Sequence, residues 1–301
     1  MAQPGSDRSR YFFEFEEPWL LDYPVEFYLS GYLFERFYDG YSVGRKGGSI
    51  GIGKRFTRKF KANIRYRREQ VDIGDIDASS PIDAARQKGE HDLGVWRVSV
   101  GYDTRDSRIF PTKGGTIGTY AELAGVPAGG NVNFWKYGVN GSLFMKLWEF
   151  PKETAHVLHL KAETGLAGPA FGDDEVPIYE RYFAGGIGSM RGFAFRGIGP
   201  RQAAGGDTAL GGDFLFLGSA EYVIPLYKED YQGYIFTDVG TVSRSIQADA
   251  FSKLRTSVGF GFRFSLPVMG RIPLTVNFGF PIEKQPEDER QVFNFALGLF
   301  F

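Results

Sequence analysis

The chain alternates apolar and polar residues over long runs. The clearest run lies between residues 255 and 266. Every second residue belongs to a mostly apolar set, which comprises Thr256, Val258, Phe260, Phe262, Phe264 and Leu266. The residues between them form a polar and glycine set, which comprises Arg255, Ser257, Gly259, Gly261, Arg263 and Ser265. Because successive side chains of a β-strand point to opposite faces, this pattern predicts a strand with one apolar face. Residues 272–281 and 58–70 repeat the pattern.

The length of these runs separates two all-β architectures. A soluble sandwich also alternates, but its strands average about five or six residues. Alternating runs of roughly nine to eleven residues, closed into a barrel so that no backbone amide faces lipid unpaired, are typical of strands in an outer membrane. We therefore expect an all-β, transmembrane antiparallel β-barrel.

About thirteen segments of the chain alternate in this way. They lie near residues 10–17, 25–36, 41–56, 58–70, 93–104, 115–124, 132–148, 155–166, 212–224, 231–242, 254–267, 272–281 and 291–301. Short connectors alternate with longer, more polar ones at 71–92, 167–211 and 243–253, as expected of a barrel with a periplasmic and an outer face. No composition break divides the chain, so 1–301 is predicted as one barrel domain with a disordered lead over 1–9.

Composition and charge narrow the function classes. The 301 residues include 41 glycines, 29 phenylalanines, 16 tyrosines and no cysteine, and the net charge is −1. This charge gives no argument for a nucleic-acid partner, and the lack of cysteine excludes disulfides and thiolate metal sites. No apolar run approaches the roughly 20 residues that a membrane helix needs. Either the chain is soluble or it crosses a membrane as strands.

The segment 185–201 is predicted to be neither helix nor strand, because six of its seventeen residues are glycine. Loops this long and glycine-rich are usually functional or disordered. Its centre, Arg191-Gly192-Phe193, favours function, since carboxylates can hold a guanidinium in a polar cavity while the aromatic ring packs. The alternative is that Arg191 is a solvated loop cation.

These three residues resemble the Arg-Gly-Phe/Tyr loop of the BamA-like outer-membrane assembly factor family, also known as bacterial surface antigens. Met190 departs from the family, which more often has valine there. Other segments resemble family motifs in the same order, and they are Gly101 to Asp106 with Pro111 and Gly114-Gly115, Pro177 to Gly186, Gly211-Gly212, and Phe236 to Gly240.

The resemblance implies a fold and a site. Members carry about sixteen strands preceded by periplasmic POTRA domains, an even number as closed antiparallel barrels require. This chain aligns from about the fourth strand, so those modules and about three strands are absent from it. The resemblance also implies that the long loop folds inward and that Asp238 and Glu221 hold Arg191. The pattern alone favours an inward Glu221, but it leaves the orientation of Asp238 open, because Asp238 shares its parity with Tyr234 and Phe236.

The resemblance further implies a non-enzymatic factor, without cofactors, in a Gram-negative outer membrane. It would insert unfolded outer-membrane protein clients through a lateral seam between its first and last strands. The partners implied are the lipid bilayer, these clients, and periplasmic POTRA domains or accessory lipoproteins. The alternative is a protein-translocating or passive pore, as in the secretion branch of the family, with the Arg191 loop as a plug.

The C-terminal segment ends on an aromatic residue. One parity there is apolar throughout, and it comprises Phe293, Phe295, Leu297, Leu299 and Phe301. This resembles the terminal-strand sorting signal of outer-membrane barrels, although any last barrel strand must alternate.

Three other sequence patterns are weaker evidence for a function. Residues 48–54 have the glycine and lysine spacing of a phosphate loop, but Arg55 replaces the Ser/Thr that would bind magnesium and no helix follows. His156 and His159 lie three apart, so a strand places them on opposite faces and they are expected to be two interfacial histidines rather than a metal site. No Gly-x-Ser-x-Gly elbow of a lipase is present.

Overall fold

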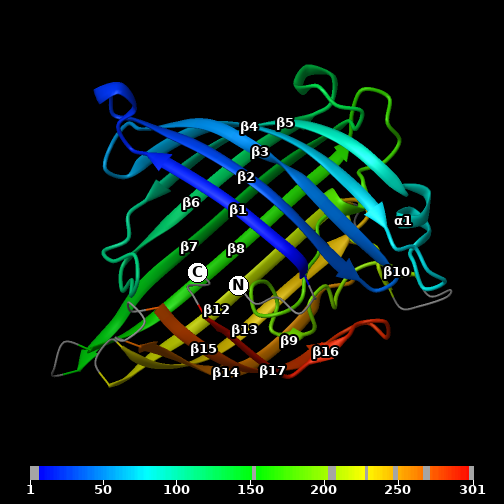
Figure 1. Ribbon diagram of the computed structural model, residues 1–301. Helices are drawn as coiled ribbons and strands as arrows, with labels where there is room; N and C mark the ends of the chain where they lie inside the picture. Colours follow the sequence, from blue (N-terminus) through cyan, green and yellow to red (C-terminus); the bar gives the residue numbers. More distant parts are fainter. Residues whose placement is uncertain are drawn as a thin grey trace.

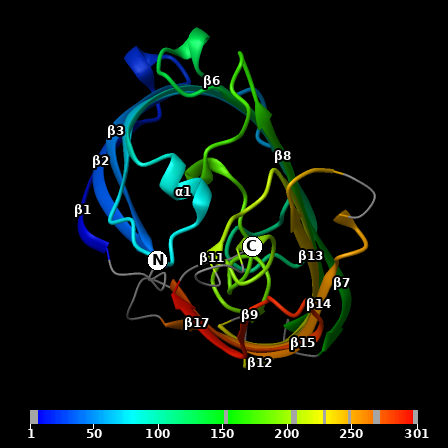
Figure 2. The ribbon, with the colours of Figure 1, turned by 90° about the vertical axis from the view of Figure 1, so that its right-hand side faces the viewer.

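Long strands make up most of the computed structural model, which describes residues 7–150, 154–202, 208–227, 230–246, 250–266 and 272–297. Among these residues, thirteen strands form one antiparallel sheet in which each strand follows its sequence neighbour (Figure 1). They are β1 (Asp7–Glu17), β2 (Val25–Tyr38), β3 (Tyr41–Arg55), β4 (Phe60–Gly74), β5 (Gly89–Asp103), β6 (Gly114–Ala124), β7 (Phe134–Phe150), β8 (Thr154–Pro169), β12 (Phe214–Tyr227), β13 (Tyr231–Ser243), β14 (Arg255–Leu266), β15 (Ile272–Glu283) and β17 (Phe293–Leu297). The sheet curves into the wall of a barrel (Figure 2).

The remaining elements are short. Two pairs of two-residue strands lie outside the main sheet, β9 (Gly192–Phe193) with β16 (Arg290–Gln291) and β10 (Arg201–Gln202) with β11 (Thr208–Ala209). The helices are α1 (Ile82–Arg86), η1 (Leu20–Asp22), η2 (Val126–Ala128) and η3 (Ile178–Glu180). Within the described ranges, none of them has the length and apolar character needed to cross a membrane.

Each predicted segment corresponds to a strand, which confirms the all-β antiparallel barrel, but several boundaries differ. Strand β1 begins at Asp7, so residues 7–9 of the expected disordered lead are strand, whereas residues 1–6 lie outside the described part. The connector predicted over 71–92 spans only 75–88, because the β4–β5 ladder continues through polar pairs such as Asp72↔Glu90. The loop expected over 167–211 spans 170–213.

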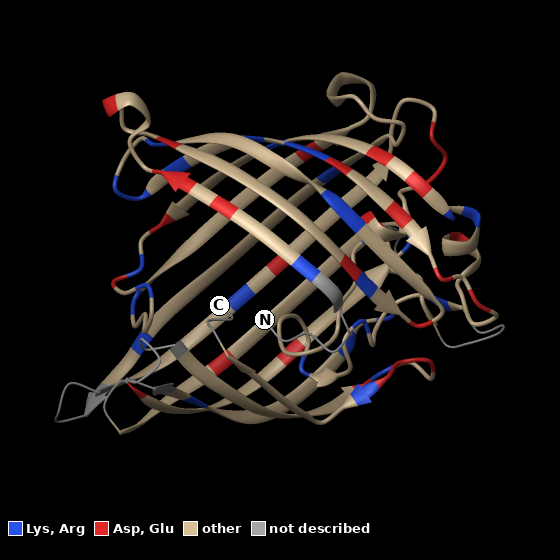
Figure 3. Cartoon of the chain, viewed as in Figure 1, with Lys and Arg blue, Asp and Glu red and all other residues tan. Residues whose placement is uncertain are grey.

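The alternation assigns each strand an outer and an inner face. On β14 and β15 the outward side chains of Val258, Phe260, Phe262 and Phe280 are 36% to 44% exposed. Arg255, Ser257 and Arg263, on the opposite parity of β14, are buried. An apolar outer face is what a bilayer requires of a spanning strand. Charged residues form short bands between longer uncharged stretches of the strands (Figure 3).

Connector length differs between the two ends of the barrel. One end carries short turns such as 56–59, and the other carries 75–88, 170–213 and 244–254. The turn 39–40 is an exception at the long-loop end, where Gly40 has φ +85° and a Cβ would lie 2.6 Å from the Ser80 nitrogen. Inside the ring of strands lie α1 and the described part of the 170–213 loop (Figure 2), so protein occupies the lumen at this end.

The sheet has two terminal strands. Among the described residues, β1 is paired with β2 alone and β17 with β15 alone in the main sheet. Each therefore presents one edge of backbone amides and carbonyls without a ladder partner in the main sheet.

We expect circular dichroism of the protein in detergent or bilayers to be dominated by β-structure. Its migration on a gel should change on heating, since a folded barrel retained in detergent runs differently from the unfolded chain. A helical spectrum, or full solubility of the folded protein without detergent, would contradict the barrel.

Candidate functional site

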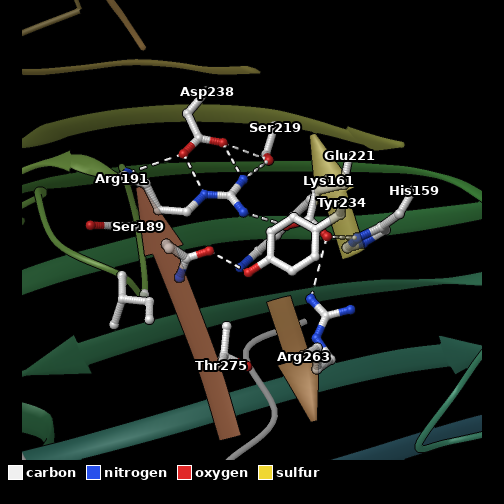
Figure 4. Close-up of a pocket in the computed structure, with 13 residues that line it drawn as sticks. His159, Lys161, Ser189, Arg191, Ser219, Glu221, Tyr234, Asp238, Arg263 and Thr275 are labelled. Carbon is white, nitrogen blue, oxygen red and sulfur yellow. Dashed lines mark hydrogen bonds and ion pairs between the residues drawn. The ribbon is translucent and has the colours of Figure 1, made fainter. Parts of the chain in front are cut away.

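The loop between β8 and β12, residues 170–213, carries Arg191 to the inner face of β12, β13 and β14. Figure 4 shows its side chain directed at carboxylates from two of these strands, Asp238 of β13 and Glu221 of β12. All three side chains are at most 8% exposed. The structure therefore brings together the three residues that the resemblance implies, and Arg191 is not a solvated cation.

The guanidinium is held at both edges of its plane. Arg191 Nε donates to Asp238 Oδ2 at 2.8 Å and Nη2 to Asp238 Oδ1 at 2.6 Å, a bidentate pair. Nη1 donates to Glu221 Oε1, and Nη2 also donates to Ser219 Oγ at 2.9 Å. Burial alone would lower the pKa of Arg191, but Glu221 and Asp238 outweigh it and hold that pKa above its ordinary value.

The backbone of the motif is fixed as well. Arg191 N donates to Asp238 Oδ2 at 3.0 Å, and the Arg191 carbonyl accepts from Ser257 Oγ of β14 at 2.6 Å. Gly192 has φ +90°, and a Cβ on Gly279 of β15 would lie 2.5 Å from the Gly192 nitrogen. The two glycines therefore allow the loop backbone to lie directly on the wall.

Two aromatic residues complete the binding site of the Arg191 side chain. Its Cζ lies 3.5 Å from the centre of the Phe236 ring and 5.9 Å from that of Tyr234. Both rings are buried and share the inner face with Asp238, which explains the ambiguous parity of β13. The inner face is apolar here because the loop, rather than water, covers it; Phe193 and Met190 pack there against Leu215, Leu217 and Val242.

Two further groups that sequence reasoning missed contact Glu221. His159 Nδ1 of β8 lies 3.4 Å and Arg263 Nη2 of β14 lies 3.5 Å from Glu221 Oε2. His159 is buried in the lumen, so the expectation of an interfacial histidine was wrong for it, because its parity faces this carboxylate. His156 does lie on the other face, within 2.8 Å of the Tyr222 hydroxyl.

A cavity of about 40 Å³ lies beside Arg191, lined also by Lys161, Thr275 and Asn277 (Figure 4). This volume suits about one water molecule. In the described ranges no group of three or more metal-ligating side chains is arranged around an ion.

A second buried ionic cluster, the Glu180 site, ties the same loop to the opposite wall. Glu180 Oε1 accepts from Arg45 of β3 at 3.2 Å and from Arg67 of β4 at 3.4 Å. Lys136 of β7 lies 3.7 Å from Oε2 and donates to the Glu180 carbonyl at 2.8 Å. Burial alone would raise the pKa of Glu180, but Arg67, Arg45 and Lys136 lower it to about 2.

A third cluster joins three loops at the long-loop end. Arg181, fully buried, pairs with Asp83 of α1 and with Glu175 at 3.0 Å. Arg244, in the 244–254 connector, reaches the same Asp83 carboxylate at 2.7 Å. Burial would raise the pKa of Asp83, but Arg181 and Arg244 outweigh it and lower that pKa. These contacts fix α1 and the connector onto the Arg191 loop.

The terminal strand shows the expected parity as far as it is described. Phe293, Phe295 and Leu297 are exposed on the outer face, and Asn294 between them is buried. Leu299 and Phe301 lie outside the described residues. Their role in sorting stays a prediction. Residues 48–54 lie within β3, so the phosphate-loop spacing there has no structural counterpart.

Comparison with known proteins identifies the family. The model of the Omp85 superfamily domain matches residues 1–301. The chain belongs to the Omp85 superfamily. The resemblance noted from the Arg191 loop and its flanking motifs is thereby confirmed.

The relatives found include assembly factors of this superfamily. Outer membrane protein assembly factor BamA of Nitratidesulfovibrio vulgaris is 30% identical over 299 residues, covering 98% of this chain and 36% of that protein. BamA of Neisseria meningitidis is 27% identical, covering 68% and 28%. The SAM50-like protein CG7639 of Drosophila melanogaster is 25% identical, covering 79% and 52%. The chain thus spans about a third of the length of the BamA relatives.

Solved structures agree on the fold. The crystal structure of BamA from Haemophilus ducreyi lacking POTRA domains 1–3 superposes with a TM-score of 0.79 at 21% identity, covering 95% of this chain and 61% of that one. CdiB from Acinetobacter baumannii gives 0.59 at 15% identity, covering 96% and 49%. Barrel and relatives together make this Omp85 chain an integral outer-membrane protein.

Replacing Arg191 tests the buried pair. Arg191→Ala leaves Asp238 and Glu221 close together without their shared cation, so it should lower the free energy of unfolding by about 3–5 kcal/mol. Arg191→Lys should recover only part of this, because a point charge cannot bind two carboxylates in a planar fork. Thermal shift of the barrel measures both, with Arg58→Ala in an exposed turn as control. A double-mutant cycle with Asp238→Asn that gives a coupling energy near zero would contradict the pair.

The Glu180 site predicts an acid-dependent loss of stability. The folded pKa of about 2 lies below the ordinary 4.5, so the stabilising contribution is complete above pH 4.5 and is lost as the pH falls toward 2. Over this window wild type should lose on the order of 3 kcal/mol more than Glu180→Gln, since each pKa unit corresponds to about 1.4 kcal/mol. The measurement is the difference between the two melting temperatures as a function of pH. Parallel curves for the two proteins would refute a charged Glu180.

Proposed function

We propose that this chain assembles proteins into a Gram-negative outer membrane, by inserting unfolded client barrels through a lateral seam between the first and last strands of the complete barrel. The step forms and breaks only non-covalent contacts. An incoming client strand pairs with a strand edge exposed at this seam and lengthens the sheet, as in β-augmentation. The named function of the BamA relatives supports this proposal, as does the barrel they share with this chain.

The observation that carries the proposal is that the Arg191 loop braces the lumen of a barrel which this chain shares with the BamA relatives. The Arg191 loop is tied by buried ion pairs to β12 and β13 on one wall and to β3 and β4 on the other. A braced wall can keep its strand pairing while a strand edge at the seam pairs with a client.

Further partners belong to the same proposal. The bilayer surrounds the outer face, and POTRA domains or accessory lipoproteins would deliver clients from the periplasm. The second candidate is a protein-translocating or passive pore with the Arg191 loop as plug. What favours it is the loop itself, which lies inside the ring of strands (Figure 2).

Cysteine crosslinking tests the seam directly, because the natural chain has no cysteine. Phe295 in β17 and Val98 in β5 both expose their side chains on the outer face, but among the described strands of the main sheet β17 is terminal, whereas β5 has a partner on each side. During folding of a client barrel carrying one cysteine, Phe295→Cys should crosslink to the client and Val98→Cys should not. Equal crosslinking at both positions would argue against insertion at the seam.

Conductance separates the two candidates. If the chain is a plugged pore, Arg191→Ala should raise its conductance in planar bilayers, because the loop is released from the wall. Adding client proteins should leave this conductance unchanged. An assembly factor should instead lose client folding in proteoliposomes, by about tenfold if the pair is worth more than about 1.4 kcal/mol to the active state. An Arg191→Ala protein that folds clients at the wild-type rate would remove the main residue-level support for the proposal.

A further inference from the structure

The terminal strand changes its pairing partner. Strand β17 pairs with β15 from Leu274↔Leu297 to Phe278↔Phe293, and the Gly279 nitrogen still donates to the Val292 carbonyl at 2.9 Å. β15 itself continues to Glu283, but the chain preceding Val292 leaves it. Arg290 and Gln291 form β16 and pair instead with β9, which is Gly192–Phe193 of the Arg191 motif.

The pairing with the loop extends beyond those two residues. The Ala194 nitrogen donates to the Glu289 carbonyl at 3.0 Å, and the Glu289 nitrogen donates to the Gly197 carbonyl at 2.9 Å. A Cβ on Gly197 would lie 2.8 Å from the Glu289 oxygen, so this close approach requires glycine. We call residues 285–292 the latch segment.

A buried ion pair anchors the latch segment to the wall. Arg255 of β14 donates from Nε to Asp288 Oδ2 and from Nη2 to Asp288 Oδ1, both at 3.0 Å. The Arg255 and Asp288 side chains are 2% and 0% exposed. Asp288 also accepts from the Gln285 nitrogen at 2.6 Å, which fixes its own turn.

The same strand holds both partners of the latch. On the inner face of β14, Arg255 binds Asp288, and two positions away Ser257 donates to the Arg191 carbonyl. Arg191 is followed by Gly192, which pairs with Gln291, and Phe293 begins β17 two residues later. The path from the Arg191 site to the terminal strand is therefore continuous hydrogen-bonded backbone.

We propose that the latch segment couples the seating of Arg191 to the position of the terminal strand, with Arg255 and Asp288 as positioning residues. While Arg191 is bound by Asp238 and Glu221, β9 holds β16, and the residues that precede β17 are kept on the loop and away from β15. Release of either end frees the other. The coupling is a property of the isolated barrel; its use in presenting the β17 edge to a client rests on the proposed function.

Hydrogen exchange of the full chain in nanodiscs, without any client, tests the coupling. Asp288→Asn should speed exchange by about tenfold in residues 290–297 and also in 192–197, because hydrogen bonds to charged groups are the stronger class. Arg191→Ala should in turn speed exchange in 290–297, since coupling between two sites is reciprocal. Strand β6 should exchange at the wild-type rate in both variants.

Glu287→Gln is the matched control, since Glu287 is 45% exposed and lies 4.0 Å from Arg255. If Asp288→Asn yields no folded protein, Gly197→Ala opens the latch from the loop side without altering charge. Faster exchange in 192–197 with unchanged exchange in 293–297 would overturn the latch, whatever the chain does to clients. Coupled exchange together with unaltered client folding in Asp288→Asn would leave the latch standing and reject its role in insertion.

Discussion

The position of the long loop depends on one buried guanidinium. Out of water, Arg191 is tolerated only because two carboxylates, a hydroxyl and an aromatic face surround it at once. These groups come from β12 and β13, and Ser257 of β14 holds the adjacent carbonyl. The binding site of Arg191 therefore exists only when three strands are paired in this register, and the loop backbone beside it pairs with β16.

A second consequence concerns the inside of the barrel. A water-filled lumen would favour polar inner faces, but here the loop supplies an apolar surface of its own through Met190, Phe193 and Ile198. At the long-loop end another apolar cluster joins Ile178 of the loop to Val71, Leu93 and Phe134 of the wall. The loop thus supplies an apolar core inside the barrel, and the ion pairs of the Arg191 and Glu180 sites attach it to the wall.

The sequence predicts the wall better than the interior. Alternation locates each strand because it depends only on neighbours in the chain, and its errors fall at strand ends such as residues 7–9. Inner-face chemistry depends on what covers that face, so Tyr234, Phe236 and His159 were ambiguous or misplaced. The family resemblance, and not the alternation pattern, predicted that Asp238 and Glu221 bind Arg191. The Arg45–Glu180 pair joins positions 135 apart, and no local pattern announces it.

The distances along the sequence between paired residues also predict the order in which these contacts form during folding. Arg191 and Asp238 are 47 residues apart, whereas Glu180 and Arg45 are 135 apart. Closing the longer span costs about 0.9 kcal/mol more in chain entropy, since each doubling adds about 0.6 kcal/mol. Local contacts tend to form before distant ones. The loop is thus expected to dock first on the C-terminal strands, where it serves as a surface against which the N-terminal wall then curls.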